Sequence, residues 1–177
     1  EVSNNFVSTQ DTSNCSYCNE GYTQICYNLL DNVTFIEGDS LCFNENNLTV
    51  IAAFIDSSTA TFGNNVVEPL EFGTQNWING NLQSLKVNNL QLSGGIPIEI
   101  CQLTQLKSLE LHGNELSGEI PDCIGNLGNL TYLNLGWNAL YGEIPDSIGN
   151  LINLTYLNLL SNQLTGKIPS SIGSLIN

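Results

Sequence analysis

Aliphatic residues return at seven fixed positions in every 24 residues from Leu82 onward, which gives four units. The second unit has them at Leu106, Leu109, Leu111, Leu116, Ile120, Ile124 and Leu127. The other three units have Leu, Ile or Val at all the corresponding positions. Around Leu109 and Leu111 apolar and polar residues alternate, which predicts a short strand with one buried face. Toward Leu127 an apolar spacing of three or four predicts a short helical or 3₁₀ turn.

Other residue types also recur at fixed positions. An asparagine follows the strand as Asn114, Asn138 and Asn162. Its side-chain amide can satisfy backbone groups that a bend would leave buried and unpaired. Gly118 and Ile120-Pro121 then favour a left-handed residue and an extended return path. Because no unit can bury its aliphatic side chains alone, the units are predicted to stack into a solenoid, with parallel strands about 4.8 Å apart.

The run from Leu106 to Pro121, LKSLELHGNELSGEIP, resembles the plant-type extracellular leucine-rich repeat. That repeat builds the ectodomains of plant receptor kinases, receptor-like proteins and polygalacturonase-inhibiting proteins. The resemblance covers residues 82–177, as repeats 82–105, 106–129, 130–153 and 154–177. It implies an α/β solenoid with 24-residue units, a parallel β-sheet on the concave face and a disulfide-containing N-terminal cap domain. It does not name a ligand, since members of the family bind peptides, steroids and other proteins.

Residues 1–81 are predicted to form the N-terminal cap domain. This part has ten acidic residues and no basic one. The apolar run Leu48–Ile55 is interpreted as a buried strand. The helical segment and the Trp-Gly-Val-x-Cys-like pattern that usually precede the first repeat in plant members are not recognised here, and Trp77 has no cysteine after it.

The charge balance excludes two classes of partner. Three lysines and no arginine stand against 17 acidic residues, and the net charge is −14. Nucleic acid is excluded because its binding depends on cationic side chains that neutralise phosphates, and an anionic membrane surface is excluded for the same reason. No apolar run approaches the roughly 20 residues of a membrane span, so no direct membrane insertion is expected.

Cysteines and sequons indicate an extracellular protein, either secreted or on the cell surface. The even set of cysteines is predicted to form disulfides: Cys15, Cys18, Cys26, Cys42, Cys101 and Cys123. A zinc half-site at Cys15-x-x-Cys18 is the weaker alternative, because a matching second pair is missing. Cys101 and Cys123 lie in adjacent units and can clip them together, although pairing with the N-terminal set stays open. N-glycosylation is predicted at the sequons of Asn14, Asn32, Asn47, Asn129 and Asn153. The start of the chain lacks signal-peptide features, which is typical of a mature chain.

The concave face is where a ligand is expected. Its candidate binding residues are Glu110, His112, Tyr132, Asn134, Trp137, Tyr156 and Asn158. Aromatic side chains interleaved with amides suit a protein, peptide or glycan. The alternative is ordinary strand-surface filling, with Tyr132 and Tyr156 stacking on each other.

No catalytic constellation is found, so no enzyme activity, cofactor or metal is expected. His112 is the one imidazole and has no nucleophile in a recognisable motif. Glu119 and Glu143 share one repeat position and Asp122 and Asp146 another. Calcium binding by these acids is less favoured than simple solvation, because no calcium-loop spacing is present. Lys167, at the position of Glu143 in the next unit, could pair weakly with it.

These observations predict a non-enzymatic secreted glycoprotein that acts as a recognition module. The alternative is a structural subunit of an extracellular assembly or filament. The last unit has the consensus pattern rather than a polar capping pattern, so it would expose a leucine-lined end. Such an end indicates either a piece of a longer solenoid or head-to-tail docking with another copy.

Overall fold

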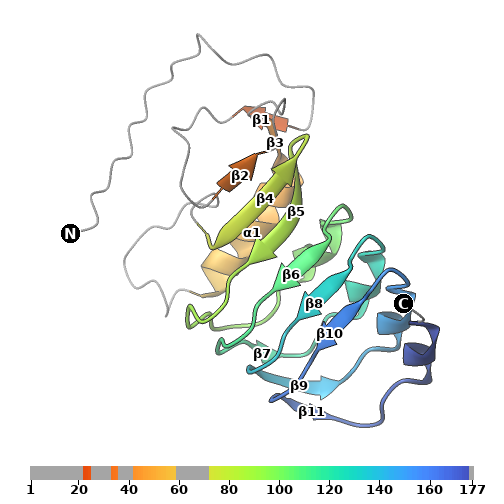
Figure 1. Cartoon of the computed structure of the whole chain (residues 1–177). Coiled ribbons are helices and arrows are strands. Elements are labelled where there is room, and N and C mark those ends of the chain that lie inside the picture. Colours follow the sequence, from red (N-terminus) through yellow and green to blue (C-terminus); the bar gives the residue numbers. More distant parts are fainter. Residues whose placement is uncertain (1–21, 25–32, 36–41, 59–71, 176–177) are drawn as a thin grey trace.

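The computed structural model describes residues 22–24, 33–35, 42–58 and 72–175. Its repeating units stack side by side and turn gradually from one to the next (Figure 1). Each unit contributes a strand to a six-stranded sheet, which has the spatial order β10-β8-β6-β5-β4-β2. The strands are β2 (Val33–Phe35), β4 (Thr74–Ile78), β5 (Asn81–Lys86), β6 (Ser108–Glu110), β8 (Tyr132–Asn134) and β10 (Tyr156–Asn158). Two further short strands, β1 (Tyr22–Gln24) and β3 (Cys42–Asn44), pair antiparallel.

The strands of the units pair in parallel and in exact repeat register. Leu85 lies opposite Leu109, which lies opposite Leu133, which lies opposite Leu157. Equivalent side chains therefore form rows across the sheet, and the aliphatic rows point into the core. The parallel sheet predicted from the apolar period is confirmed.

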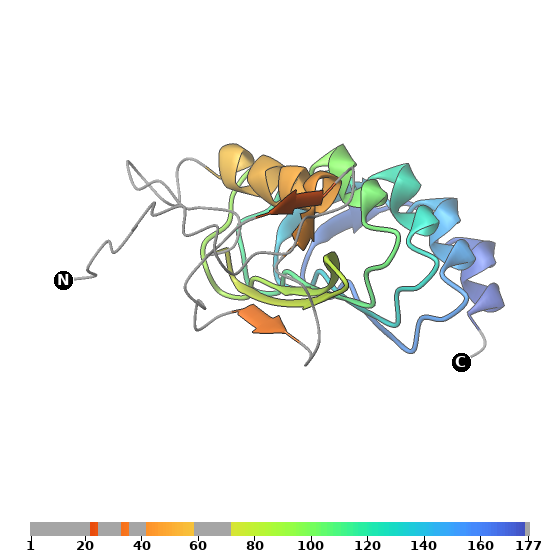
Figure 2. The same ribbon diagram turned by 90° about the horizontal axis from the view of Figure 1, so that it is seen from above.

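A row of 3₁₀ turns lies on the opposite side of the molecule, together with helix α1 (Glu45–Ser57), as Figure 2 shows. Each turn begins directly after the proline of its unit. The turns are η3 (Ile98–Gln102), η4 (Asp122–Asn126), η5 (Asp146–Asn150) and η6 (Ser170–Ser174). Proline fixes an extended residue at the entry to each turn, and the predicted 3₁₀ geometry is confirmed.

A second parallel sheet follows the bend of each unit and was not predicted. It has the order β11-β9-β7, and its strands are β7 (Ser117–Gly118), β9 (Ala139–Glu143) and β11 (Gln163–Thr165). Gly118, Gly142 and Gly166 lie in or directly after these strands with φ of 84°, 79° and 77°. The left-handed residue expected at the glycine position is therefore present in each of these units.

The seven aliphatic rows make the core. In the second unit all seven side chains are at most 3% exposed. In the fourth unit Leu154 is buried, but Leu157, Leu159, Leu164, Ile172 and Leu175 are only partly buried. The core is thus built between units, as expected for elements that cannot bury their aliphatic side chains alone.

The asparagine row satisfies buried backbone groups, as predicted. The Asn114 Nδ2 donates to the carbonyls of Val87 and Leu111, at 2.6 and 2.9 Å. Its Oδ1 accepts from the amides of Leu90 and Leu92, at 3.0 and 3.1 Å. Asn138 and Asn162 repeat this pattern one and two units further on. Each asparagine thereby joins its own bend to that of the preceding unit.

The strand interpretation of Leu48–Ile55 is wrong, because this run lies within helix α1. Val50, Ile51 and Phe54 are all fully buried, and their spacing of one and three residues forms one helix face. The helix begins after Asn44, whose side chain accepts from the amide of Asn46. Helix α1 packs against η3, so the helical segment that sequence analysis did not recognise is present before the first repeat.

The six-stranded sheet is extended on its N-terminal side by a hairpin. Strands β4 and β5 pair antiparallel, and Asn79 and Gly80 between them have φ of 49° and 72°. Two positive φ values match the type I′ turn that Asn-Gly favours. The buried Trp77 on β4 donates from Nε1 to Gln75 Oε1 at 2.9 Å, so its indole closes this end of the core.

Cys101 and Cys123 form a disulfide between the first and second units, with Cα atoms 5.7 Å apart. The alternative pairing with the N-terminal set is therefore not adopted. Cys15, Cys18 and Cys26 lie outside the described residues, and the structure does not describe the side chain of Cys42. None of the described helices is long and apolar enough to cross a membrane.

Candidate functional site

The sheet face is the side of strands β5, β6, β8 and β10 that points away from the core. In-register pairing places Glu110, Asn134 and Asn158 in one row across it. Ser108, Tyr132 and Tyr156 form the neighbouring row. The structure thus brings five of the predicted binding residues together on adjacent strands. His112 and Trp137 lie in the turns that follow the strands.

Tyr132 and Tyr156 form an aromatic stack on the sheet face. Their ring centroids lie 4.2 Å apart and their planes differ by 4°. Burial is the largest cause that raises the pKa of Tyr132. A hydrogen bond to Tyr156 and the charges of Tyr156 and Glu110 raise this pKa further, whereas a hydrogen bond to Asn134 lowers it. Tyr156 is 40% exposed, so the stack offers one open aromatic surface to a ligand.

A polar network lies beside the tyrosines toward the N-terminal end of the sheet face. Lys86 Nζ is 3.3 Å from Glu110 Oε2, and Asn88 Nδ2 donates to the same oxygen at 3.1 Å. The Asn88 Oδ1 in turn accepts from the backbone amide of His112 at 2.9 Å. The His112 Nδ1 is buried and has no hydrogen-bond partner. The network fixes the Glu110 carboxylate in place, and a fixed carboxylate costs a ligand less ordering entropy to engage.

Asn134 and Asn158 use part of their amides to shape the sheet face itself. The Asn134 Oδ1 accepts from Gly136 N at 3.2 Å, and the Asn158 Oδ1 accepts from Leu160 N at 3.0 Å. A Cβ at Gly136 would lie 2.7 Å from Asn158 Nδ2, so glycine lets this amide pack close to the strand end. Asn134 is only 8% exposed, which leaves Asn158 as the more accessible amide.

Trp137 lies at the edge of the sheet face, in the turn between β8 and β9. Its φ is 56°, and its amide donates to Leu160 O at 2.8 Å. The equivalent residues Asn89, Gly113 and Ser161 also have positive φ, of 56°, 71° and 56°. The stacked backbone therefore imposes a left-handed residue here in every unit. Asn and Gly accept this conformation readily, whereas for a bulky side chain it is an outlier.

The family model of the leucine-rich repeat matches residues 105–127, 129–151 and 153–175. These segments are leucine-rich repeats. The first residues of the matched segments are 24 residues apart, which is the period of the aliphatic pattern. A comparison with curated protein sequences found no match.

Solved structures of plant receptors resemble the chain. It is 28% identical to the BIR2 ectodomain of Arabidopsis thaliana, with a TM-score of 0.62, over 73% of this chain and 74% of that one. It is 25% identical to the ectodomain of the Arabidopsis thaliana receptor kinase SOBIR1, with a TM-score of 0.62, over 75% of each chain. It is 29% identical to the plant peptide hormone receptor RGFR1, in complex with RGF2, with a TM-score of 0.50, over 59% of this chain and 22% of that one. The chain thus spans about a fifth of that receptor, and its resemblance to plant extracellular leucine-rich repeats is confirmed.

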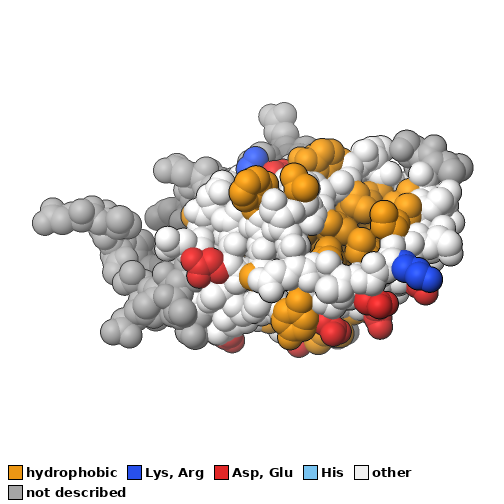
Figure 3. Space-filling view, turned by 90° about the horizontal axis from the view of Figure 1, so that it is seen from below, with side chains coloured by type: hydrophobic (Ala, Val, Ile, Leu, Met, Phe, Trp, Pro, Cys, Tyr) orange, Lys and Arg blue, Asp and Glu red, His pale blue; other side chains and the backbone are white. Residues whose placement is uncertain are grey.

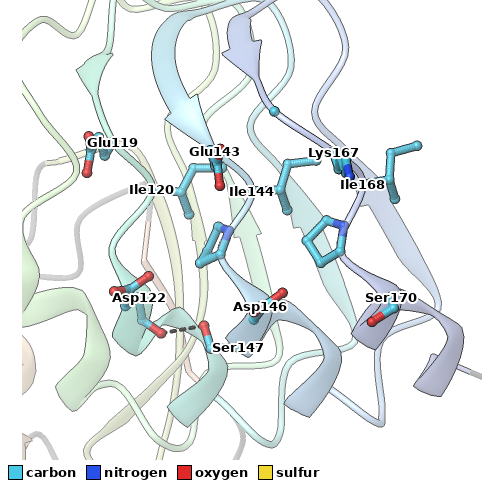
Figure 4. A pocket seen from close by; sticks show the side chains of 13 residues that line it. Glu119, Ile120, Asp122, Glu143, Ile144, Asp146, Ser147, Lys167, Ile168 and Ser170 are labelled. Atoms are coloured by element: carbon cyan, nitrogen blue, oxygen red, sulfur yellow. Dashed lines mark hydrogen bonds between the residues drawn. The ribbon is translucent and has the colours of Figure 1, made fainter.

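A hollow of about 980 Å³ lies between the second sheet and the 3₁₀ turns of the leucine-rich repeats (Figure 4). Its border carries both acidic rows, Glu119 and Glu143 on one side and Asp122 and Asp146 on the other. Within the described ranges no cation forms an ion pair with these carboxylates, so the expected pairing of Lys167 with Glu143 is not observed. The described residues also contain no group of three or more metal-ligating side chains.

The predicted glycosylation sites differ in their accessibility. Asn129 and Asn153 are exposed, and each donates from Nδ2 to a carbonyl of the preceding repeat, Thr104 O and Gly128 O. Asn47 lies in helix α1, is only 5% exposed and accepts from Leu82 N at 2.8 Å through its Oδ1, so this predicted site is much less accessible than the other two. Asn14 and Asn32 lie outside the described residues.

One exposed aromatic residue was missed by sequence analysis. Tyr141, on β9, is 51% exposed. Its position in the other repeats is held by Ser93, Ser117 and Thr165, which is the signal that could have identified it. A single aromatic residue at a position that is otherwise small and polar is not required by the solenoid.

Proposed function

We propose that this chain is an extracellular leucine-rich-repeat recognition module that binds a protein or peptide through its sheet face. The contact is made by the Tyr132–Tyr156 stack, the Asn158 amide and the fixed Glu110 carboxylate. Residues 1–81 act as the N-terminal cap domain and 82–177 as the binding domain. Asn129 and Asn153 carry glycans on the edge of the solenoid, away from the sheet face.

The observation that carries this proposal is the tyrosine stack on the sheet face, which lies beside a single ion pair, Lys86–Glu110. The two rings lie 4.2 Å apart, and Tyr156 leaves 40% of its surface open. Tyrosine supplies a large rigid contact area and a hydrogen-bonding hydroxyl, and it is enriched among the residues that dominate binding energy. The Lys86–Glu110 network next to it offers a preorganised acceptor for a donor on the ligand.

The comparisons support the same class of function. RGFR1 is described as a peptide hormone receptor in complex with RGF2, and it shares this repeat architecture with the chain. BIR2 and SOBIR1 are matched over about three quarters of their chains. A scaffold that presents rows of side chains on an open sheet suits an extended ligand, because each repeat adds a further set of contacts.

A selection from a displayed library of random 12-residue peptides tests the proposal. The purified glycosylated chain is the bait, and selected peptides are then measured by calorimetry. Tyr156→Thr is expected to weaken binding by about tenfold or more, because it removes the open ring of the stack. Ile98→Thr, which removes a 66% exposed apolar side chain from η3, is the matched control and should leave affinity unchanged. Selected peptides that bind the Tyr156→Thr variant as tightly as the parent chain would exclude the sheet face.

The alternative function is that of a subunit that docks head to tail into a filament. Light scattering across a concentration series distinguishes it from the recognition proposal. A monomer at every concentration is expected from the recognition proposal. Growth of the scattering mass, abolished by Ile168→Ser at an exposed apolar side chain of the last repeat but not by Tyr156→Thr, would favour assembly. The same calorimetry with cell-wall oligosaccharides in place of peptides tests whether the ligand is a glycan.

A further inference from the structure

The third repeat has an apolar stripe where the other repeats are polar. Trp137 lies in the turn before β9, and Ala139 and Tyr141 lie on the strand, so the three residues occupy every second position of the sequence. The same three positions hold Asn89, Gln91 and Ser93 in the first repeat, Gly113, Glu115 and Ser117 in the second, and Ser161, Gln163 and Thr165 in the fourth. Three neighbouring repeats thus show that the fold itself needs no apolar side chain there. We call Trp137, Ala139 and Tyr141 the third-repeat stripe.

The stripe is exposed, and its exposure does not depend on the ends of the solenoid. Trp137 is 58% and Tyr141 51% exposed, although a repeat packs on each side of both residues. Trp137 also has a φ of 56°, which disfavours a bulky side chain. An exposed indole in a disfavoured backbone conformation gives the isolated chain little stability. Strain of this kind points to a role in binding.

Acidic side chains continue from the stripe toward the hollow of Figure 4. Glu143 lies on β9 two residues beyond Tyr141, and it lines the hollow together with Glu119. Glycines hold both side chains in place. A Cβ at Gly142 would lie 2.9 Å from Glu119 Cγ, and one at Gly166 would lie 2.7 Å from Glu143 Oε1. Figure 3 shows this side of the molecule, where apolar side chains gather and acidic ones lie along one border.

We propose that the third-repeat stripe and the adjoining carboxylates form a second docking surface, for an extended segment of another protein that has apolar residues followed by basic ones. This surface lies on the second sheet and goes beyond the sheet-face site proposed above. The apolar residues cover Trp137 and Tyr141. The basic residues pair with Glu143 and Glu119, which form no ion pair within the described residues, although Lys167 also lines the hollow.

Charge and spacing select this partner over others. An interface centre enriched in aromatic residues and poor in charge, with a charged border, is the usual anatomy of protein contacts. The border here is acidic on a chain of net charge −14, so the complementary segment is basic. Alternate residues of an extended chain recur about every 6.6 Å, so an apolar residue followed two residues later by a lysine matches the spacing of Tyr141 and Glu143 on β9.

Three synthetic nine-residue peptides test the proposal by fluorescence anisotropy with the full chain. The first has Phe and Leu at alternate positions, followed by two Lys at alternate positions, with Gly and Ser elsewhere. The second replaces both Lys with Glu, and the third replaces Phe and Leu with Ser. Only the first is expected to bind well, with the other two weaker by about tenfold or more. Absence of binding by the first peptide, or equal binding of the first and second, overturns the proposal.

Variants then place the peptide on the molecule. The double variant Trp137→Ser, Tyr141→Thr copies the residues of the next repeat, so it keeps the fold and is expected to weaken the first peptide by about tenfold. Glu143→Gln weakens it less, by about threefold, and flattens its salt dependence. Glu99→Gln is the control of equal charge change on η3 and should have no effect.

Tyr156→Thr distinguishes this surface from the sheet face. Loss of the first peptide with Tyr156→Thr, but not with the double variant, would contradict the second surface while supporting the proposed function. Concentration-dependent dimers that the double variant abolishes would assign the stripe to a second copy of this chain and overturn the segment proposal. Peptides that lose affinity with Tyr156→Thr should retain it with Tyr141→Thr, because Tyr141 lies on the second sheet whereas Trp137 borders the sheet face.

Discussion

The Nδ2 of Asn114 lies 2.6 Å from the carbonyl oxygen of Val87 in the preceding repeat. The same side chain makes three further hydrogen bonds of 3.1 Å or less to backbone groups. Asn114→Ala leaves these buried groups unpaired, so we expect it to lower the free energy of unfolding by about 3 kcal/mol. Urea unfolding measures this. Asn129→Ala is the control, because its one bond to Thr104 is exposed and its loss should cost less than about 1 kcal/mol.

The Tyr132 hydroxyl in the tyrosine stack should have a raised pKa. Because burial and then Tyr156 raise the pKa of Tyr132, its phenolate should form at higher pH than that of a free tyrosine. Above the ordinary tyrosine pKa the unfolded chain loses this proton first, so the contribution to stability is complete below that pH and is lost as the pH rises through the folded-state pKa. Phenolate absorbance follows the titration. Tyr156→Phe removes the Tyr156 hydroxyl and keeps the ring, so it should lower the pKa of Tyr132 in part, because burial remains. An unchanged titration curve would contradict a contribution from the Tyr156 hydroxyl.

The disulfide should be a measurable source of stability. Cys101 and Cys123 are 22 residues apart in sequence, and a crosslink of this loop size restricts the unfolded chain by about 3 kcal/mol. The double variant Cys101→Ser, Cys123→Ser is therefore expected to unfold at lower urea concentration with a folded structure otherwise unchanged. Reduction of the parent chain with dithiothreitol should shift its unfolding midpoint to that of the double variant, provided the N-terminal cysteines are alkylated in both samples.

Substitution of the two tryptophans should change the stability by very different amounts. Trp137→Asn relieves a left-handed backbone strain of about 1 kcal/mol and removes a mostly exposed side chain, so stability should change by less than about 1 kcal/mol. Trp77→Asn removes a fully buried indole, and we expect a loss of more than about 3 kcal/mol. Acrylamide should quench the fluorescence of Trp137 and leave that of Trp77 largely intact. A large loss of stability with Trp137→Asn would show that its indole has a structural role.

The repeats could be predicted from the sequence because one physical constraint acts on them 24 residues at a time. Each of Leu109, Leu111 and their equivalents faces the same neighbours, so the period of the apolar pattern is also the period of the structure. The role of Asn114 followed from its chemistry, because an amide at a buried bend has both a donor and an acceptor to offer.

Apart from the second sheet, the parts that were missed have no such repetition. Leu48–Ile55 is a continuous apolar run, and such a run does not distinguish a strand from a helix that is buried on several sides. Asn44 was the useful signal, since it caps the helix. Asn79-Gly80 marked the hairpin, but the alignment of repeats began two residues later and left it outside. Tyr141 was missed because the repeats were aligned on the positions that they share, and this position differs in the third repeat alone.

The crosslink between Cys101 and Cys123 gives the unfolding of this chain a direction. Contacts in a solenoid join only neighbouring repeats, so each repeat is held by the two beside it. The first and second repeats are covalently joined, and α1 packs on the first, whereas the fourth repeat has a core that is only partly buried. Hydrogen exchange should therefore advance from β10 toward β6 and slow sharply at the crosslinked pair, so that the N-terminal half remains folded while the C-terminal repeats open.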